Sequence, residues 1–282
     1  MTITGAAKLA GVMGWPVAHS RSPALHGFWL AEHGIDGAYV PLPVKPENLT
    51  RVLRALPMMG FAGCNITIPL KEDAMRAVDE CDAAARRAGV VNTVIVQPRG
   101  MLLGTNTDGF GFLENLRAGV PGWRASAGPA VVLGAGGAAR AVVAALIDAG
   151  APEIRLVNRT PERAAALAKS LGGPVRGIAW SEREKSLAGA ALLVNATSLG
   201  MEGQVALELS LAALPGDAVV NDIVYVPLET PLLAAARARN NPCVDGLGML
   251  LHQGRPGFAA WFGVMPAVTP ELRQAMIATL PK

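Results

Sequence analysis

Hydrophobic residues along this chain form two patterns, short dense runs and longer stretches in which apolar positions recur at helical spacing. The short runs predict strands at Lys8–Gly14, Ala38–Val44, Gly60–Ile66, Val90–Gln97, Ala130–Leu133, Glu153–Val157, Leu192–Asn195 and Ala218–Asp222. The longer stretches predict helices at Pro23–His33, Pro46–Leu56, Asp82–Ala88, Phe110–Ala118, Ala138–Ala149, Pro161–Leu171, Pro231–Ala238 and Pro270–Leu280. Strands that alternate with helices in this way predict an α/β protein with a parallel sheet covered by helices on both faces.

Several of these helices start with a hydroxyl residue followed by proline, namely Ser22-Pro23, Thr160-Pro161, Thr230-Pro231 and Thr269-Pro270. Proline suits the first helical position, where its missing N–H would have no partner. Ser or Thr just before it predicts a side-chain cap on the helix.

The length of 282 residues favours two domains over one. The segment 119–129 is rich in Gly, Pro and Ser. It predicts a loop near a domain boundary, and a fresh strand–helix–strand unit follows it.

Composition excludes several classes of function. Hydrophobic residues make up 51% of the chain and charged residues 17%, so we expect a sizeable core rather than disorder. The net charge is +3 and no run of Lys or Arg is present, which argues against a nucleic-acid partner. The apolar stretch Gly128–Gly150 carries Arg140 in its middle and is dense in Gly and Ala, so it does not suit a membrane span.

Cysteine usage indicates a reducing compartment. Cys64, Cys81 and Cys243 are widely spaced, odd in number and without CxxC or His partners. This pattern argues against a disulfide framework and a zinc site, and it predicts a cytoplasmic protein without a metal.

The strongest local signal is a glycine-rich turn after the strand Ala130–Leu133. Gly134, Gly136 and Ala139 occupy the three positions of the G-x-G-x-x-G/A fingerprint. The first glycine allows the tight turn, the second lets a pyrophosphate approach the backbone, and the helix N-terminus offers free N–H groups to phosphates. A turn in an ordinary α/β domain can also contain such glycines, but the strand, turn, helix and second strand together favour a dinucleotide site.

The second strand of that unit ends in Asn158-Arg159-Thr160, where NAD enzymes place an Asp or Glu for the adenosine ribose. A carboxylate there would repel a 2′-phosphate, whereas a guanidinium binds it with two hydrogen bonds. Arg159 is alternatively a surface residue, and Thr160 a simple helix cap. Because Asn158 stands in place of the acidic residue and Arg159 lies next to it, we favour NADP over NAD.

Polar residues gather in the first half of the chain, near the ends of predicted strands. Ser20 and Ser22 are two apart, so an extended segment would present both hydroxyls on one side, and Asn65 and Thr67 are two apart on a predicted strand. The other members of this set are Lys71, Asn92 and Asp108. In open α/β sheets the carboxyl ends of the strands line the ligand crevice. Each residue alone has an ordinary explanation as a cap, loop or surface residue. Together, these hydroxyls, amides, one Lys and one Asp suit a polyhydroxylated substrate.

The ordered set of segments resembles the shikimate dehydrogenase family over nearly the whole chain. The matching segments are PVAHSRSP at 16–23, GCNITIPLK at 63–71, VNTV at 91–94, NTDG at 106–109, GAGGAA at 134–139, NRT at 158–160, NATS at 195–198, DIVY at 222–225 and DGLGM at 245–249. Gly27 stands where the family usually has Asn, and Val91 where Ala is usual, but neither change removes a chemical group from the reaction. The resemblance implies the reversible, NADPH-dependent reduction of 3-dehydroshikimate to shikimate, a step towards chorismate and the aromatic amino acids.

The family fold implies an N-terminal α/β substrate-binding domain, residues 1–109, completed by C-terminal helices within 246–282. It implies a Rossmann-type NADP-binding domain at 110–245, with the active site in the cleft between the two domains. A small-molecule substrate is then the expected partner, and the chain is expected to be a monomer or a homodimer.

Position by position, the resemblance places substrate contacts and the catalytic pair at Ser20, Ser22, Thr67, Lys71, Asn92, Asp108, Tyr225 and Gln253. It places cofactor contacts, with Gly134 of the fingerprint, at Gly136, Gly137, Ala138, Asn158, Arg159, Thr160, Thr197, Gly246 and Met249. Gly246, Met249 and Gln253 have the spacing i, i+3, i+7 of one helix face. The adjoining Leu247, Leu250 and Leu251 would equally suit a core helix.

We expect Lys71 to donate a proton to the alkoxide that forms on reduction, and to accept it in the reverse direction. We expect Asp108 to hydrogen-bond the substrate hydroxyl and to orient the lysine. The sequence leaves open how the acid/base work is divided between these two residues.

Three other functions share part of these signals. A quinate or aminoshikimate dehydrogenase of the same family tends to differ at Ser22 and at Asn158-Arg159, and both sites here are of the shikimate and NADP type. A ligand sensor that has lost turnover would not need Lys71 and Asp108. An unrelated Rossmann dehydrogenase acting on folate or an amino acid would have no reason to combine the Ser-Arg-Ser and Asn-Thr-Asp elements.

Overall fold

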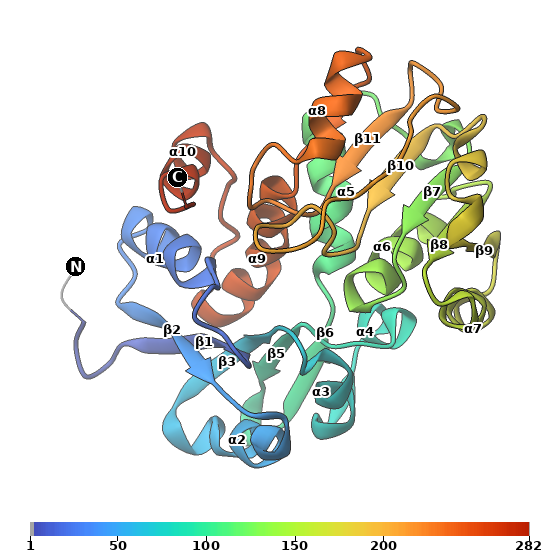
Figure 1. Cartoon of the computed structure of the whole chain (residues 1–282). Helices are drawn as coiled ribbons and strands as arrows, with labels where there is room; N and C mark the ends of the chain where they lie inside the picture. The colour runs from blue at the N-terminus through green and yellow to red at the C-terminus, as the bar shows by residue number, and fades with distance from the viewer. Residues whose placement is uncertain (1–2, 282) are drawn as a thin grey trace. The chain divides into compact units, whose positions relative to one another are not determined.

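The computed structural model describes residues 3–281, and the chain divides into two compact units that each contain a sheet (Figure 1). The first unit extends to Asp108 and also contains Leu251–Thr279, whereas the second is Gly109–Leu250 together with Leu280 and Pro281. The chain passes between the units at the start of α5 (Asp108–Gly119) and within α9 (Leu247–Phe262). No helix among the described residues has both the length and the apolar character needed to cross a membrane.

The first unit is built on a six-stranded sheet in the order β2-β1-β3-β5-β6-β4. Its strands are β1 (Lys8–Gly14), β2 (Gly37–Pro43), β3 (Phe61–Ile66), β4 (Glu80–Cys81), β5 (Thr93–Val96) and β6 (Leu102–Thr105). Besides most of α9, its helices are α1 (Ser22–Glu32), α2 (Leu49–Ala55), α3 (Lys71–Ala77), α4 (Ala83–Ala88) and α10 (Pro270–Ile277).

This sheet is mixed, which corrects the expectation of a fully parallel sheet in this half of the chain. Strand β5 runs antiparallel to both of its neighbours, β3 and β6. The reason is local, because only a short turn separates β5 from β6, with Gln97 N donating to Met101 O at 2.8 Å. A turn of that length can only return the chain in the opposite direction, whereas a parallel pair needs a long crossover.

Helices cover both faces of the first sheet. Helices α2 and α3 bury leucine and alanine side chains against Met13, Ile66 and Leu102 on one face. On the other face an aromatic cluster from α1, β2 and α9 packs together, made up of His26, Trp29, Tyr39, Phe258 and Trp261. Helices α1 and α10 lie side by side, and the Trp29 indole donates to Ala267 O at 3.1 Å (Figure 1).

The second unit contains a fully parallel sheet in the order β12-β11-β10-β7-β8-β9. Its strands are β7 (Ala130–Leu133), β8 (Ile154–Asn158), β9 (Val175–Ala179), β10 (Leu192–Asn195), β11 (Val219–Asp222) and β12 (Cys243–Val244). Its helices are α6 (Gly137–Asp148), α7 (Pro161–Leu171) and α8 (Pro231–Ala238), with nearly all of α5. This is the doubly wound order of dinucleotide-binding folds, in which the strand order reverses between β7 and β10.

The two faces of the second sheet follow from the two-residue period of its strands. Ala130 and Val132 face a core that includes α5, α6 and α7, whereas Val131 and Leu133 face a core that includes α8. The central strand β7 is buried on both faces, so all four of its residues are hydrophobic, as is usual in parallel sheets.

The helix starts show where local patterns predicted the structure and where they did not. Thr230 and Thr269 do cap α8 and α10, accepting from Leu233 N at 3.3 Å and Leu272 N at 3.2 Å. Thr160 precedes α7 without a capping bond from its side chain. Ser22 is the first residue of α1 rather than its cap, because Arg21 already has helical backbone angles.

Candidate active site

Lys71 and Asp108 form an ion pair in the first unit. Each is the first residue of a helix, α3 and α5 respectively, just beyond the carboxyl ends of β3 and β6. Lys71 Nζ lies 2.5 Å from Asp108 Oδ2, and the two side chains are 18% and 3% exposed. The carboxylate is therefore closed off from water, whereas the ammonium keeps some access to solvent.

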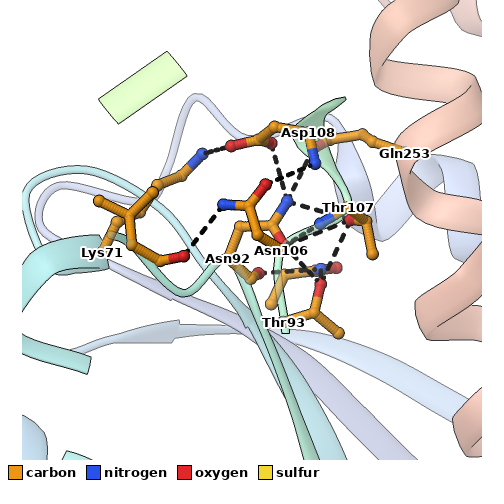
Figure 2. Close-up of polar contacts among 9 residues, drawn as sticks. Lys71, Asn92, Thr93, Asn106, Thr107, Asp108 and Gln253 are labelled. Carbon is orange, nitrogen blue, oxygen red and sulfur yellow. Dashed lines mark hydrogen bonds and ion pairs between the residues drawn. The ribbon is translucent and has the colours of Figure 1, made fainter. Parts of the chain in front are cut away.

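Asn92 occupies the other oxygen of the same carboxylate (Figure 2). Its side-chain amide donates to Asp108 Oδ1 at 2.7 Å and to Gln253 Oε1 at 3.2 Å. Its side-chain oxygen accepts from Thr107 N and from Thr93 Oγ1, each at 2.9 Å. With donors on both oxygens, Asp108 is held in one orientation as a hydrogen-bond acceptor.

The antiparallel strand β5 brings these residues together. Asn92, just before β5, accepts from Ile66 N at 2.7 Å and donates through its own N–H to Thr105 O at 3.1 Å. Lys71 O accepts from Val91 N at 3.0 Å. The ends of β3, β5 and β6 are thus joined by main-chain hydrogen bonds at the point where Lys71, Asn92 and Asp108 project.

A second polar chain reaches this site from β2, and sequence reasoning missed its first member. Tyr39 donates from its hydroxyl to Asn65 Oδ1 at 2.6 Å, and Asn65 donates to Thr93 Oγ1 at 2.9 Å. Burial raises the pKa of the Tyr39 phenol well above its usual value, with a smaller contribution from the Cys64 thiol and an opposing hydrogen bond with Ser22. The only available signal was a tyrosine in a strand, in a chain that has just two.

Ser20 and Ser22 lie in the same unit, but the segment between them is not extended. Arg21 has φ −91° and ψ −5°, so the chain turns into α1, and Ser22 N donates to Ser20 Oγ at 3.3 Å. The expectation that Ser20 and Ser22 present their hydroxyls on one side of an extended segment is therefore wrong, because the chain forms a turn there. Thr67, just after β3, is anchored by its N–H to Met13 O at 2.9 Å.

The glycine-rich turn of the second unit leaves its backbone uncovered by side chains at the start of α6. Gly134 has φ +106°, and a Cβ there would lie 2.9 Å from Ala196 O. Gly136 precedes α6 with an extended backbone and no capping side chain, and nothing lies within 4 Å of the place of its Cβ. Gly137 and Ala138 are the first two residues of α6, so their N–H groups lie at the open end of a 12-residue helix.

The end of β8 carries the residues expected to distinguish NADP from NAD. Asn158 is its last residue, and its side chain donates to Thr160 O at 3.0 Å. Arg159 and Thr160 are exposed. The position that an acidic residue takes in NAD enzymes is therefore occupied by an amide, and the exposed guanidinium next to it suits a 2′-phosphate.

The remaining candidate residues divide between the two units. Thr197, Tyr225, Gly246 and Met249 lie in the second unit, whereas Gln253 lies in the first. Met249 is 7% exposed and packs in the core of the second unit. Gly246, just before α9, has no space for a side chain because the Ile223 carbonyl lies against it.

Two family models match this chain. Residues 12–94 match the shikimate dehydrogenase substrate binding domain, and residues 123–202 match shikimate / quinate 5-dehydrogenase. The first match contains Lys71 and Asn92, and the second contains the glycine-rich turn and Arg159.

The chain is also similar to individual proteins over nearly its whole length. It is 64% identical over 276 residues to a shikimate dehydrogenase (NADP(+)) from Paramagnetospirillum magneticum, a match that covers 98% of this chain and 100% of that protein. It is similar to the crystal structure of shikimate 5-dehydrogenase from Thermus thermophilus in complex with NADP(H) and shikimate, with a TM-score of 0.85, 41% identity and coverage of 97% and 100%. A quinate dehydrogenase from Corynebacterium glutamicum in complex with NAD has a TM-score of 0.89 at 32% identity, with coverage of 96% and 99%.

Proposed function

This chain belongs to the shikimate dehydrogenase family, and from that premise we propose that it catalyses the reversible, NADPH-dependent reduction of 3-dehydroshikimate to shikimate. The observation that carries the proposal is the ion pair between Lys71 and Asp108, which Asn92 joins to Gln253. It combines a proton donor with amide groups suited to hydroxyls, as this reaction requires.

We propose that the first unit binds the substrate and the second binds NADP. The glycine-rich turn, the uncapped N-terminus of α6 and the exposed Arg159 support the second part, because they suit a pyrophosphate and a 2′-phosphate. When bound, the nicotinamide supplies or accepts the hydride. The contacts proposed for it and for its ribose, at Thr197, Gly246 and Met249, all come from the second unit.

Lys71 is the proton donor of this proposal. Its Nζ donates to Asp108 Oδ2, which sets the direction of the ammonium group, and its partial exposure leaves it open to a substrate oxygen. In the direction of reduction, Lys71 Nζ gives one proton to the oxygen that was the carbonyl oxygen, and in the direction of oxidation it takes that proton back. A positioned group of this kind contributes about 10²–10⁴-fold to the rate.

The other polar residues bind and orient the substrate in this account. Asn92 uses its amide on Asp108 and on Gln253, so Gln253 keeps its NH₂ group as a donor for a hydroxyl. Ser20, Ser22 and Thr67 supply hydroxyl groups from the first unit, and Tyr225 supplies one from the second. A substrate that lacks a hydroxyl would leave such groups without a partner, which is the basis of strong discrimination.

Initial rates with shikimate or quinate, each with NADP⁺ or NAD⁺, test this function. We expect fast turnover with shikimate and NADP⁺ alone. A preference for quinate or for NAD⁺ would move the chain to the quinate or aminoshikimate branch of the family. Binding of ligands without turnover in every pairing would overturn the enzyme assignment and leave a sensor of the same fold.

We further propose that the protein is cytoplasmic and works as a monomer or a homodimer. The free thiols of Cys64, Cys81 and Cys243 are consistent with a reducing compartment. Light scattering on the purified protein measures the oligomeric state directly, and a larger assembly would contradict this proposal.

A further inference from the structure

Asp222, the last residue of β11, is a buried carboxylate in the second unit that the proposed chemistry does not use. It is 0% exposed. Its Oδ1 accepts from Asn195 Nδ2 at 2.9 Å and from Val224 N at 3.0 Å, and its Oδ2 accepts from Thr230 Oγ1 at 2.7 Å. Burial raises the pKa of this carboxyl to about 6, against the effect of these hydrogen bonds.

A buried carboxylate at this position lowers the stability of the fold, so stability alone does not explain its presence. Removing a charge from water is unfavourable unless a counter-ion or several donors compensate it. Among the ion pairs within residues 3–281, none includes Asp222, and its partners there are two side-chain donors and one backbone N–H. An apolar residue would fit a sheet core more simply, so the role of Asp222 lies in the segments that its three hydrogen bonds hold in place.

The bond to Asn195 fixes the loop that follows β10. Asn195 is paired with Asp222 across the parallel strands, and its Oδ1 accepts from Thr197 N at 3.1 Å and from Thr197 Oγ1 at 2.7 Å. Thr197 Oγ1 in turn accepts from Leu199 N at 3.0 Å. The methyl group of Thr197 lies 3.1 Å from where a Cβ on Gly134 would be, so this loop packs against the glycine-rich turn.

The other two bonds fix the segment that follows β11. Val224 N binds Asp222 Oδ1, which curls the chain immediately before Tyr225. The Ile223 carbonyl of the same segment lies against Gly246. Thr230 Oγ1 donates to Asp222 and accepts from Leu233 N, so the start of α8 is held by the same carboxylate.

We propose that Asp222 is a positioning residue for NADP binding, which holds the 195–199 and 223–225 segments in the shape that the cofactor requires without itself contacting cofactor or substrate. This inference rests on the proposed function, because it assumes that the glycine-rich turn of the second unit binds NADP. A single carboxylate accepts three hydrogen bonds and thereby holds the segments after β10 and after β11 in place together. Neither Asn nor Leu reproduces this set, because Asn replaces one acceptor oxygen by an NH₂ donor and Leu removes both.

The test is a direct titration of NADP⁺ against the wild-type chain and Asp222→Asn, with KM and kcat measured in parallel. We expect the Kd and KM for NADP⁺ to rise about five- to twentyfold in Asp222→Asn, with kcat at saturation reduced less than about threefold. The matched control is Asp217→Asn, an exposed aspartate in the loop before β11, which should leave all three constants unchanged.

A purely structural role predicts a different result. Asp222→Asn would then melt at a lower temperature but bind NADP⁺ with wild-type affinity once folded, and that outcome overturns the proposal. If Asp222→Asn does not fold, Thr230→Val removes the bond to Asp222 Oδ2 together with the cap on Leu233 N, and leaves both bonds to Asp222 Oδ1 in place. It should raise the Kd for NADP⁺ about two- to fivefold, and an unchanged Kd in this variant would also overturn the proposal.

The titration separates this inference from the proposed function. A wild-type chain that binds NADP⁺ but turns over none of the substrates would refute the dehydrogenase activity, and the ratio of the two Kd values would still decide the role of Asp222. A wild-type chain that does not bind NADP⁺ would refute both.

Discussion

Asn92 and Lys71 bind opposite oxygens of the same carboxylate, with Asn92 Nδ2 at 2.7 Å from Asp108 Oδ1 and Lys71 Nζ at 2.5 Å from Asp108 Oδ2. Asp108 therefore cannot rotate without breaking a hydrogen bond to an amide or an ammonium group. Its backbone N–H is held as well, by Asn106 Oδ1 at 3.1 Å. Asn92 and Asn106 thus fix the position of Asp108, and Asp108 in turn fixes the direction of the Lys71 ammonium. Such preorganisation would favour the proposed proton transfer.

Tyr39→Phe tests whether the polar chain from β2 supports this site. The change removes the hydroxyl that donates to Asn65 Oδ1 and leaves that acceptor partly buried without its donor. We expect the free energy of unfolding to fall by about 1–3 kcal/mol, measured by urea denaturation. We also expect the KM for shikimate to rise more than the KM for NADP⁺, because Ser22 also hydrogen-bonds Tyr39. Unchanged stability together with an unchanged KM for shikimate would contradict this role.

His26 makes the stability of the first unit depend on pH. Its ring is stacked on Tyr39 with centroids 3.9 Å apart, and burial lowers its pKa from the ordinary 6.5 to about 3. Below about pH 6.5 His26 therefore binds a proton in the unfolded chain but stays neutral in the folded chain. The free energy of unfolding consequently decreases as the pH falls. We expect this residue alone to account for about 2 kcal/mol of lost unfolding free energy between pH 7 and pH 5.

The measurement is urea denaturation at pH 7 and pH 5 for the wild type, His26→Phe and His33→Gln. His26→Phe keeps an aromatic ring in the cluster and should lose most of this difference between the two pH values. His33 is exposed beside Glu32, so His33→Gln should keep the wild-type difference. An equal pH effect in all three proteins would show that His26 is not the group responsible.

Arg159→Ala tests the basis for preferring NADP over NAD. A guanidinium that binds a 2′-phosphate contributes charge-assisted hydrogen bonds, so we expect the KM for NADP⁺ to rise about 10- to 100-fold while the KM for NAD⁺ stays the same. Arg163 is also exposed and lies in the first turn of α7, and Arg163→Ala serves as the matched control. Equal effects on both cofactors would mean that Arg159 does not contact a 2′-phosphate.

Local patterns predicted some elements to the residue and missed others for identifiable reasons. The bounds of β1, β7, β10, α7 and α8 were predicted as observed, because dense apolar runs or proline starts mark them. Strands β4 and β12 have two residues each, too few for a pattern. Helix α3 was missed because its buried face consists of Ala74 and Ala77, which give no apolar period against the charged residues around them.

The candidate site was predictable only in part. The glycine-rich turn is a continuous segment whose spacing carries its chemistry, so the sequence was enough to find it. The ion pair joins residues that are 37 positions apart, and it depends on β5 running antiparallel between β3 and β6. Tyr39 contacts the site through Asn65, and nothing in its local sequence separates it from an ordinary strand residue. Asp222 begins the matching segment DIVY, but the sequence does not reveal that its partners are Asn195 and Thr230.

Lys71→Met decides whether Lys71 moves the proton or only binds the substrate. The variant keeps an unbranched side chain of similar length but carries no proton to give, and Lys169→Met, on the exposed side of α7, is the matched control. The measurement is kcat for shikimate oxidation at saturating NADP⁺, together with the Kd for shikimate by calorimetry. We predict that kcat falls about 10²–10⁴-fold while the Kd changes by less than about threefold. A wild-type kcat with a greatly weakened Kd would show instead that Lys71 binds the substrate and that another group moves the proton.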